Sequence, residues 1–193
     1  LKVRASVGVA FYPEDAVDFS HLREYADFAM YEAKNHRKGA LLRFDRKSHE
    51  RGAFILNNKE DLNRLLDENL IDYHFQPIVD ARMGEAVAYE ALMRPQLPSI
   101  ATPDRVLLLA RSQSKLYRVE HLTFFGALEA FAKHGDAARG ATLFVNSIAT
   151  QRLSSDDEVE LQKRFGPLLK HLVIEITESD YSREMSLYKE GLA

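Results

Sequence analysis

Cysteine is absent from this sequence of 193 residues, and its absence excludes disulfide bonds, thiolate metal ligands and cysteine-based catalysis. Any bound metal ion must therefore be held by oxygen or histidine ligands. A chain without disulfides suits a reducing compartment, so we expect a cytoplasmic location.

Long apolar runs and a strong net charge are also missing. No apolar stretch approaches the roughly 18 residues that a membrane span needs, and the strand-like residues 1–11 lack the apolar core of a cleavable signal peptide. A net charge of −3 gives no overall reason to expect nucleic acid or an anionic membrane as a partner. The locally basic residues 34–47 are typical of a solvated face or linker. The sequence begins without methionine inside an apparent strand and ends in a helix-like stretch without a capping residue, so we expect a fragment.

The first part of the chain has the pattern of a small α/β unit. Residues 3–11 predict a buried strand, and a helix with Ser20 as its N-cap is expected to run to about Asn35. A short strand over residues 40–44 follows. Residues 45–58 are polar and mixed, which is typical of a junction, and we place the domain boundary near Gly52.

The second part alternates strands and helices, as in βα units around a parallel sheet or barrel. Only residues 80–84 separate its first two strands, a hairpin-length connection, so we expect this pair to be antiparallel. Pro77 in the first strand lacks the N–H of a central ladder and indicates an edge, a bulge or an approach to an active site. The expected elements are a helix at 58–69, strands at 72–79 and 85–94, helices from Thr102-Pro103 and at 115–134, a strand at 141–146, a helix at 156–170 and a strand at 172–177.

Oxygen-bearing side chains stand at or near the carboxyl ends of three predicted strands, namely Glu90, Asn146 and Glu175. In a βα barrel these strand ends converge on one face, where active sites lie. Two carboxylates and an amide oxygen suit a hard cation such as Mg²⁺ or Mn²⁺.

The two-residue period of a strand places Glu90, Leu92 and Arg94 on one face. A cation-holding carboxylate beside a guanidinium is the arrangement that a phosphodiester would need. By themselves, however, a Glu and an Arg at this spacing are more often a surface ion pair, and Asn146 also fits a strand-end turn. Glu175 is less ordinary, because a carboxylate within an apolar strand needs a partner.

Four motifs occur in the order and approximate spacing of the EAL domain family, and the chain resembles that family in its second part. They are Phe75-Gln76-Pro77-Ile78-Val79, Tyr89-Glu90-Ala91-Leu92-Met93-Arg94-Pro95, Phe144-Val145-Asn146-Ser147 and Val173-Ile174-Glu175-Ile176-Thr177-Glu178. The first part resembles the carboxyl end of a GGDEF domain, on residues 5–10, Tyr12-Pro13-Glu14-Asp15 and residues 26–34.

The resemblance implies an α/β fold with the carboxyl-terminal part of a GGDEF-type domain over residues 1–52. Residues 53–193 would then be the first half of a modified (β/α)8 barrel whose first strand is antiparallel. The EAL family hydrolyses cyclic-di-GMP to the linear dinucleotide pGpG with two Mg²⁺ or Mn²⁺ ions.

The resemblance also assigns roles to single residues. It makes Glu90, Asn146 and Glu175 metal ligands. It makes Arg94 a contact to a substrate phosphate, places Gln76 in the nucleotide pocket and adds Leu92 to the substrate site. Lys34 and Lys38 fall near positions that contact nucleotide phosphates in the GGDEF family.

The departures from both families limit these implications. The aspartate pair, lysine, glutamate and glutamine of a complete EAL site would follow the present motifs, and the GGDEF signature loop would precede residue 1. We therefore expect the fragment alone to be inactive and the parent protein to be the phosphodiesterase. The alternatives are a catalytically inactive cyclic-di-GMP receptor and a regulatory or assembly module. Half a barrel would expose apolar edges, so a homodimer is a further expectation.

Overall fold

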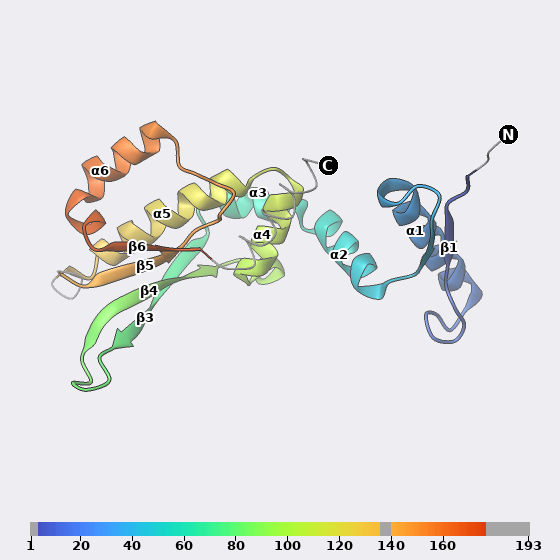
Figure 1. Ribbon diagram of the computed structural model, residues 1–193, viewed down its shortest axis with the longest axis horizontal. Coiled ribbons are helices and arrows are strands. Elements are labelled where there is room, and N and C mark those ends of the chain that lie inside the picture. The colour runs from blue at the N-terminus through green and yellow to red at the C-terminus, as the bar shows by residue number, and fades with distance from the viewer. Residues whose placement is uncertain (1–3, 136–139, 177–193) are drawn as a thin grey trace. The chain divides into compact units, whose positions relative to one another are not determined.

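The computed structural model describes residues 4–135 and 140–176, and the chain divides into two compact units between Asn57 and Asn58 (Figure 1). The boundary expected near Gly52 falls inside helix α2 (Arg46–Asn57). A helix continues through that position, so the division comes where the helix ends. Each unit is described by itself.

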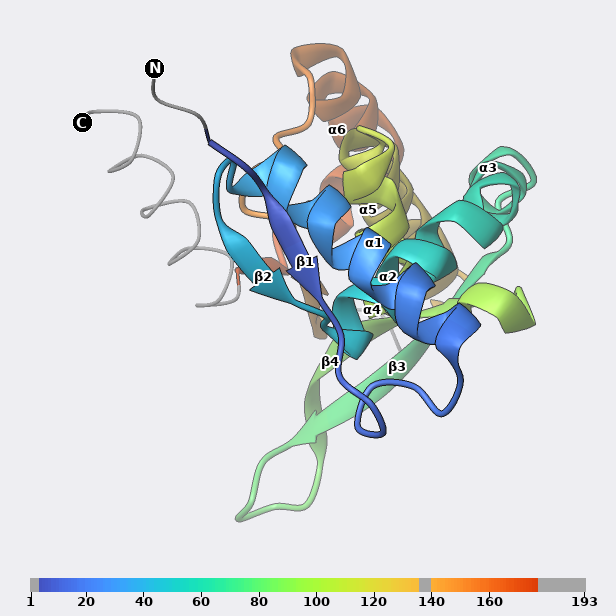
Figure 2. The ribbon, with the colours of Figure 1, turned by 90° about the vertical axis from the view of Figure 1, so that its right-hand side faces the viewer.

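In the first unit, helix α1 (Phe19–His36) connects two short parallel strands, β1 (Val7–Val9) and β2 (Leu41–Arg43) (Figure 2). Gly8 allows β1 to lie directly against the helix. A Cβ at this position would come within 2.1 Å of the Ala26 carbonyl oxygen. Any side chain here would therefore force the strand away from the helix.

The start of α1 differs from the prediction. Asp18, not Ser20, is the N-cap, and its carboxylate accepts a hydrogen bond of 2.9 Å from the backbone N–H of His21. Ser20 lies within the first turn instead. A carboxylate at the N-cap also interacts favourably with the positive end of the helix dipole.

Helix α2 occupies the stretch that the sequence analysis interpreted as a polar junction. None of its residues is fully buried. Its large apolar residues are consecutive, at Phe54-Ile55-Leu56, and are not spread along the helix at helical spacing. Its contact with the rest of the unit includes His49, whose ring lies 5.0 Å from the Phe28 ring and 5.2 Å from the Tyr25 ring.

The second unit contains a four-stranded sheet in the order β3-β4-β5-β6 (Figure 1). Strands β3 and β4 are antiparallel, as their short connection predicts, and β5 and β6 continue the sheet in parallel. The elements are α3 (Lys59–Asp67), β3 (Ile71–Val79), β4 (Ala86–Pro95), the 3₁₀ turn η1 (Pro98–Ile100), α4 (Pro103–Ser112), α5 (Leu116–Ala132), β5 (Thr142–Asn146), α6 (Ser155–Leu169) and β6 (Leu172–Glu175).

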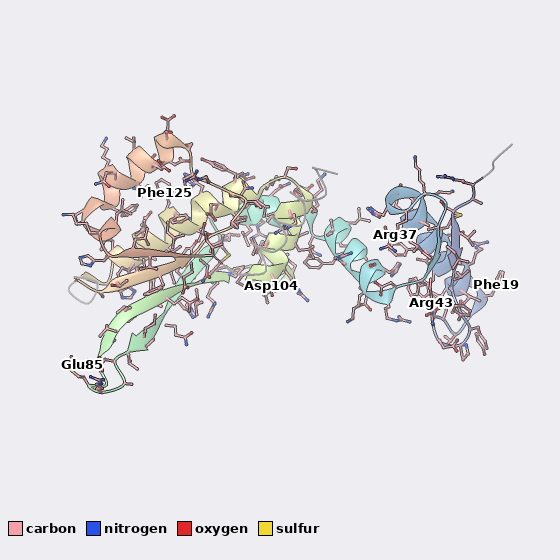
Figure 3. All side chains as sticks on the ribbon, in the orientation of Figure 1. Phe19, Arg37, Arg43, Glu85, Asp104 and Phe125 are labelled. Carbon is pink, nitrogen blue, oxygen red and sulfur yellow. The ribbon has the colours of Figure 1, made fainter. Side chains whose placement is uncertain are left out.

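The β3–β4 hairpin explains the proline in its first strand. Pro77 lies opposite Tyr89 on β3, which is the outer strand of the described sheet. The ladder is irregular between Ile78 and Val79. The turn closes where the Asp80 N–H donates to the Glu85 carbonyl, and Glu85 marks the tip of the hairpin in Figure 3. An outer strand with a bulge is where a strand proline is tolerated.

Helices α5 and α6 pack on one face of the sheet, which we call the covered face (Figures 1 and 2). Phe125 projects between the two helices, with its ring 6.4 Å from that of Phe165 (Figure 3). The buried residues of this core are Ala91, Phe124, Phe125, Ala127, Leu128, Phe131, Leu143, Val145, Leu161 and Phe165.

Candidate functional site

All six residues that the sequence analysis assigned to a metal or substrate site lie on the same face of the sheet. Phe75, Tyr89, Ala91 and Val145 belong to or pack against the covered-face core. Side chains alternate along a strand and match across the register, so their neighbours point to the opposite side. We call this opposite side the site face, and it carries Gln76, Glu90, Leu92, Arg94, Asn146 and Glu175.

The three predicted metal ligands form a row across neighbouring strands. Asn146 donates a hydrogen bond of 2.9 Å from Nδ2 to Oε1 of Glu90. On its other side, Asn146 lies directly opposite Glu175 in the parallel ladder. Three side chains that are far apart in the sequence are therefore adjacent in the fold.

Glu90 lies in the middle of β4 and not at its carboxyl end. Only residues 88–91 of β4 pair with β5, however, and Glu90 lies near the carboxyl end of that paired segment, opposite Phe144. The rest of β4, up to Pro95, continues past the end of β5. Glu90 thus sits level with the ends of the parallel strands, which is why it meets Asn146.

The chemistry of this row fits a hard divalent cation, because it offers carboxylate and amide oxygens. Glu90 and Glu175 are partly buried and Asn146 is exposed, so the oxygens are accessible. In residues 4–135 and 140–176 no group of three or more His, Asp or Glu residues gathers to hold a metal. The row itself contributes two carboxylates and one amide oxygen.

Arg94 and Leu92 extend the site along β4. Both line a cavity of about 230 Å³ that also contacts Asn146. Residues of α4 and α5 bound it, and it reaches Tyr73 and Ala91 of the covered face. Arg94 lies opposite Asp72 across the hairpin and donates from Nη1 to the Met93 carbonyl over 2.9 Å. The cavity gives Arg94 and Asn146 access to one common space.

Gln76 occupies the corresponding place on β3. It lies directly opposite Glu90 in the antiparallel ladder, and its side chain is exposed. The first ligand of the row is therefore flanked by Gln76 on one strand and Asn146 on the other.

Glu120 on α5 is a buried carboxylate that the sequence analysis did not single out. It is 1% exposed, and burial raises the pKa of its carboxyl group. Its Oε1 accepts a hydrogen bond from the Ser147 hydroxyl and its Oε2 accepts one of 3.0 Å from the Ile148 N–H. The signal in the sequence was a carboxylate in the apolar stripe of a helix, at i, i+4, i+7 and i+11 with Phe124, Ala127 and Phe131.

The two lysines predicted to contact nucleotide phosphates lie in the first unit. Lys34 is in the last turn of α1, Lys38 follows that helix, and both are exposed. Glu178, which belongs to the last of the four motifs, lies outside the described residues. A search of the described helices finds none that is both long and apolar enough to cross a membrane.

Comparison with known families decides the assignment of the second unit. A model of the EAL domain matches residues 59–192, which is most of the chain and all of the site described above. The chain belongs to the EAL domain family.

Two relatives of this EAL protein are named as cyclic di-GMP phosphodiesterases. It is 26% identical over 192 residues to the bifunctional diguanylate cyclase/cyclic di-GMP phosphodiesterase MucR of Pseudomonas aeruginosa, covering 95% of this chain and 28% of MucR. It is 34% identical over 93 residues to the cyclic di-GMP phosphodiesterase PdeR of Escherichia coli, covering 48% of this chain and 14% of PdeR. The chain thus spans less than a third of either relative.

Solved EAL structures share the fold. The EAL domain of Xanthomonas citri FimX in complex with c-diGMP superposes with a TM-score of 0.53 at 18% identity, over 74% of this chain and 56% of that one. The MucR phosphodiesterase in complex with c-di-GMP gives 0.51 at 24% identity, over 69% and 55%.

Proposed function

We propose that this EAL chain is part of a metal-dependent phosphodiesterase that hydrolyses cyclic-di-GMP to pGpG. The observation that carries the proposal is the row of Glu90, Asn146 and Glu175 on adjacent strands, beside the cavity that Arg94 lines. Curated EAL relatives named as cyclic di-GMP phosphodiesterases support the substrate.

In the proposed site, Glu90, Asn146 and Glu175 hold Mg²⁺ or Mn²⁺ through their side-chain oxygens. Bound divalent cations supply a polarised phosphoryl oxygen and a water of lowered pKa. The reaction adds water to one phosphodiester, breaks one P–O bond of the ring and leaves a linear dinucleotide.

Three further residues on the site face bind and orient the substrate in this proposal. Arg94 donates to phosphate oxygens, which its guanidinium can contact in a bidentate manner. Leu92 supplies apolar contact in the cavity that it shares with Arg94, and Gln76 contacts the nucleotide from β3. Their common face supports a single ligand for all three.

We further propose that the four-stranded sheet is the first half of a modified (β/α)8 barrel. Two observations support this architecture. The antiparallel β3–β4 pair is followed by parallel strands, and the chain superposes on just over half of the length of each of the two solved EAL chains named above. The remaining catalytic residues would then come from strands beyond this chain. The expected homodimer and the cytoplasmic location stay predictions.

We propose that the first unit is the carboxyl-terminal part of a GGDEF domain. The alignment with bifunctional MucR, which covers 95% of this chain and so most of residues 1–57, supports this origin. We propose that Lys34 and Lys38 occupy positions that contact nucleotide phosphates in GGDEF domains.

The experiment uses the full-length protein that contains this chain, incubated with cyclic-di-GMP and Mg²⁺, with pGpG formation followed by chromatography and binding by calorimetry. We expect turnover by the wild type and its loss in Glu90→Gln. Glu85→Gln is the matched control, because this exposed carboxylate lies on the same hairpin but away from the row. Binding without turnover by the metal-loaded wild type would instead identify a receptor, and neither binding nor turnover would favour a regulatory module.

A further inference from the structure

Glu120 is placed where an apolar side chain would normally be. Its neighbours along the buried side of α5 are Val119, Thr123 and Phe124, and it is 1% exposed. Burying a carboxylate is unfavourable unless hydrogen bonds compensate for the lost water. Both hydrogen bonds that its side chain makes among the described residues go to one short loop.

That loop begins directly after Asn146. The Ser147 hydroxyl and the Ile148 N–H donate to the two carboxylate oxygens of Glu120, and the Ser147 N–H donates to the Glu175 carbonyl over 2.8 Å. Ser147 is thus fixed through its side chain from the helix layer and through its backbone from β6. The residue immediately before it is Asn146, which donates to Glu90 and lies opposite Glu175 in the ladder.

We infer that Glu120 is a positioning residue for the metal site. From the covered side, it hydrogen-bonds the loop that follows β5. These bonds fix the backbone next to Asn146, whose amide donates to Glu90. Glu120 touches neither metal nor substrate. The inference rests on the proposed function, because it concerns the same row of ligands.

A purely structural role for Glu120 would need no carboxylate. Replacing both partners of a buried polar contact by apolar groups can be nearly neutral, whereas removing one partner leaves the other unsatisfied at a cost. Glu120→Leu fills similar volume but leaves the Ile148 N–H and the Ser147 hydroxyl without their partner. Glu120→Gln keeps an acceptor for the Ile148 N–H and offers an amide N–H to the Ser147 oxygen.

The test compares wild type, Glu120→Leu, Glu120→Gln and the control Thr123→Val in the full-length protein. Thr123 is also buried on α5 and lines the cavity of Leu92 and Arg94, but its hydroxyl donates to the Val119 carbonyl of its own helix and not to the loop after β5. Mn²⁺ affinity is followed by electron paramagnetic resonance, exchange of the Ile148 amide by deuterium uptake of the peptide that contains it, and folding by thermal unfolding.

We expect Glu120→Leu to remain folded, to lose protection of the Ile148 amide and to bind Mn²⁺ about 10- to 100-fold more weakly, as is usual when a residue that orients a ligand is removed. Glu120→Gln should restore most of both properties, and Thr123→Val should match the wild type.

Unchanged Mn²⁺ affinity in a folded Glu120→Leu protein, with affinity lost in Glu90→Gln, would overturn this inference alone. Mn²⁺ affinity that does not change in Glu90→Gln either would overturn the proposed metal site and this inference together. If Glu120→Leu fails to fold, Ser147→Ala replaces it, because this variant removes the hydroxyl that donates to Glu120 and leaves the carboxylate in place. A folded Ser147→Ala protein with weakened Mn²⁺ binding supports the inference, and one with unchanged Mn²⁺ binding overturns it. Equal loss of affinity in Thr123→Val would contradict it.

Discussion

The two faces of the β3–β6 sheet are built by the same strands and serve different purposes. The covered face packs Ala91, Leu143 and Val145 against α5 in an apolar core. The site face carries Glu90, Arg94, Asn146 and Glu175, which occupy the alternate positions of these strands. The parity of a residue's position along a strand therefore decides whether it joins the apolar core or the face that we propose as the site.

One residue crosses this division. Glu120 belongs to the covered side, yet it hydrogen-bonds the loop that carries Asn146 on the site side. We therefore expect most substitutions to change either the unfolding free energy or metal binding, according to their face. Substitution of Glu120 should change metal binding although this residue belongs to the covered side.

The largest effect on stability is expected from Leu128→Ala on the covered face. Leu128 is fully buried in the core cluster, and removal of such a side chain costs about 3 kcal/mol of unfolding free energy through lost burial and the cavity left behind. Val173→Ala on the site face should cost less than about 1 kcal/mol, because Val173 is 37% exposed. Urea unfolding monitored by circular dichroism measures both, and equal losses would break the comparison.

Metal binding should stabilise the protein through the site face alone. A ligand at ten times its dissociation constant raises the unfolding free energy by about 1.4 kcal/mol, since only the folded state binds it. We expect Mn²⁺ to raise the melting temperature of wild type and of Glu85→Gln, but not of Glu90→Gln. A shift of the same size in Glu90→Gln would place the metal elsewhere.

Gly126→Ala tests how closely α5 approaches the covered face. A Cβ at Gly126 would lie 2.7 Å from Cε2 of Tyr73, whose hydroxyl is held by the Leu122 carbonyl at 3.0 Å. Overpacking costs about 1 to 3 kcal/mol, which exceeds the gain of about 1 kcal/mol from replacing a helical glycine. We expect a net loss of about 1 kcal/mol in chemical unfolding.

Gly166→Ala on α6 is the matched control. Its Cβ would meet only the flexible end of Gln162 at 2.9 Å, so the substitution should be neutral or stabilising. If Gly126→Ala stabilises the protein as much as Gly166→Ala, then Tyr73 is not in tight contact with the helix.

The smallest effect is a pH dependence from Asp157 in the first turn of α6. The Tyr117 hydroxyl donates to its carboxylate and lowers its pKa, with further contributions from Ser154 and His121. A lowered pKa means that the stabilisation is present above the pKa of the unfolded chain, about 3.9, and is lost as the pH falls through the lower folded value.

We expect Asp157→Asn to lose about 0.5 kcal/mol at pH 7, which is typical of a charge at a helix N-terminus, and to be less sensitive than wild type to a fall from pH 5 to pH 3. Thermal unfolding over that range measures the difference. Parallel curves for the two proteins would show that the carboxylate is not stabilised in its ionised form.

The sequence predicted much of the fold because several signals were local. The hairpin length at residues 80–84 correctly gave the antiparallel pair, and Thr102-Pro103 correctly gave the start of α4, where Thr102 accepts a hydrogen bond from the Arg105 N–H. Helix α2 was missed because its large apolar residues are consecutive, at residues 54–56, and so do not recur at the spacing of a helix.

The site was predictable in its membership but not in its geometry. The two-residue period placed Glu90, Leu92 and Arg94 on one face, but it does not say which face the helices cover. Nor does it show that only part of β4 pairs with β5, which brings Glu90 level with Asn146. Glu120 was missed because a single carboxylate within an apolar helical pattern does not by itself show which groups it contacts.

The most direct test of the account is the location of Mn²⁺ by anomalous X-ray scattering in crystals of the full-length protein. We predict an anomalous peak on the site face in contact with the side-chain oxygens of Glu90, Asn146 and Glu175, and no such peak in Glu90→Gln. Mn²⁺ bound away from these three residues in the wild type would contradict the assignment of the site face as the metal site.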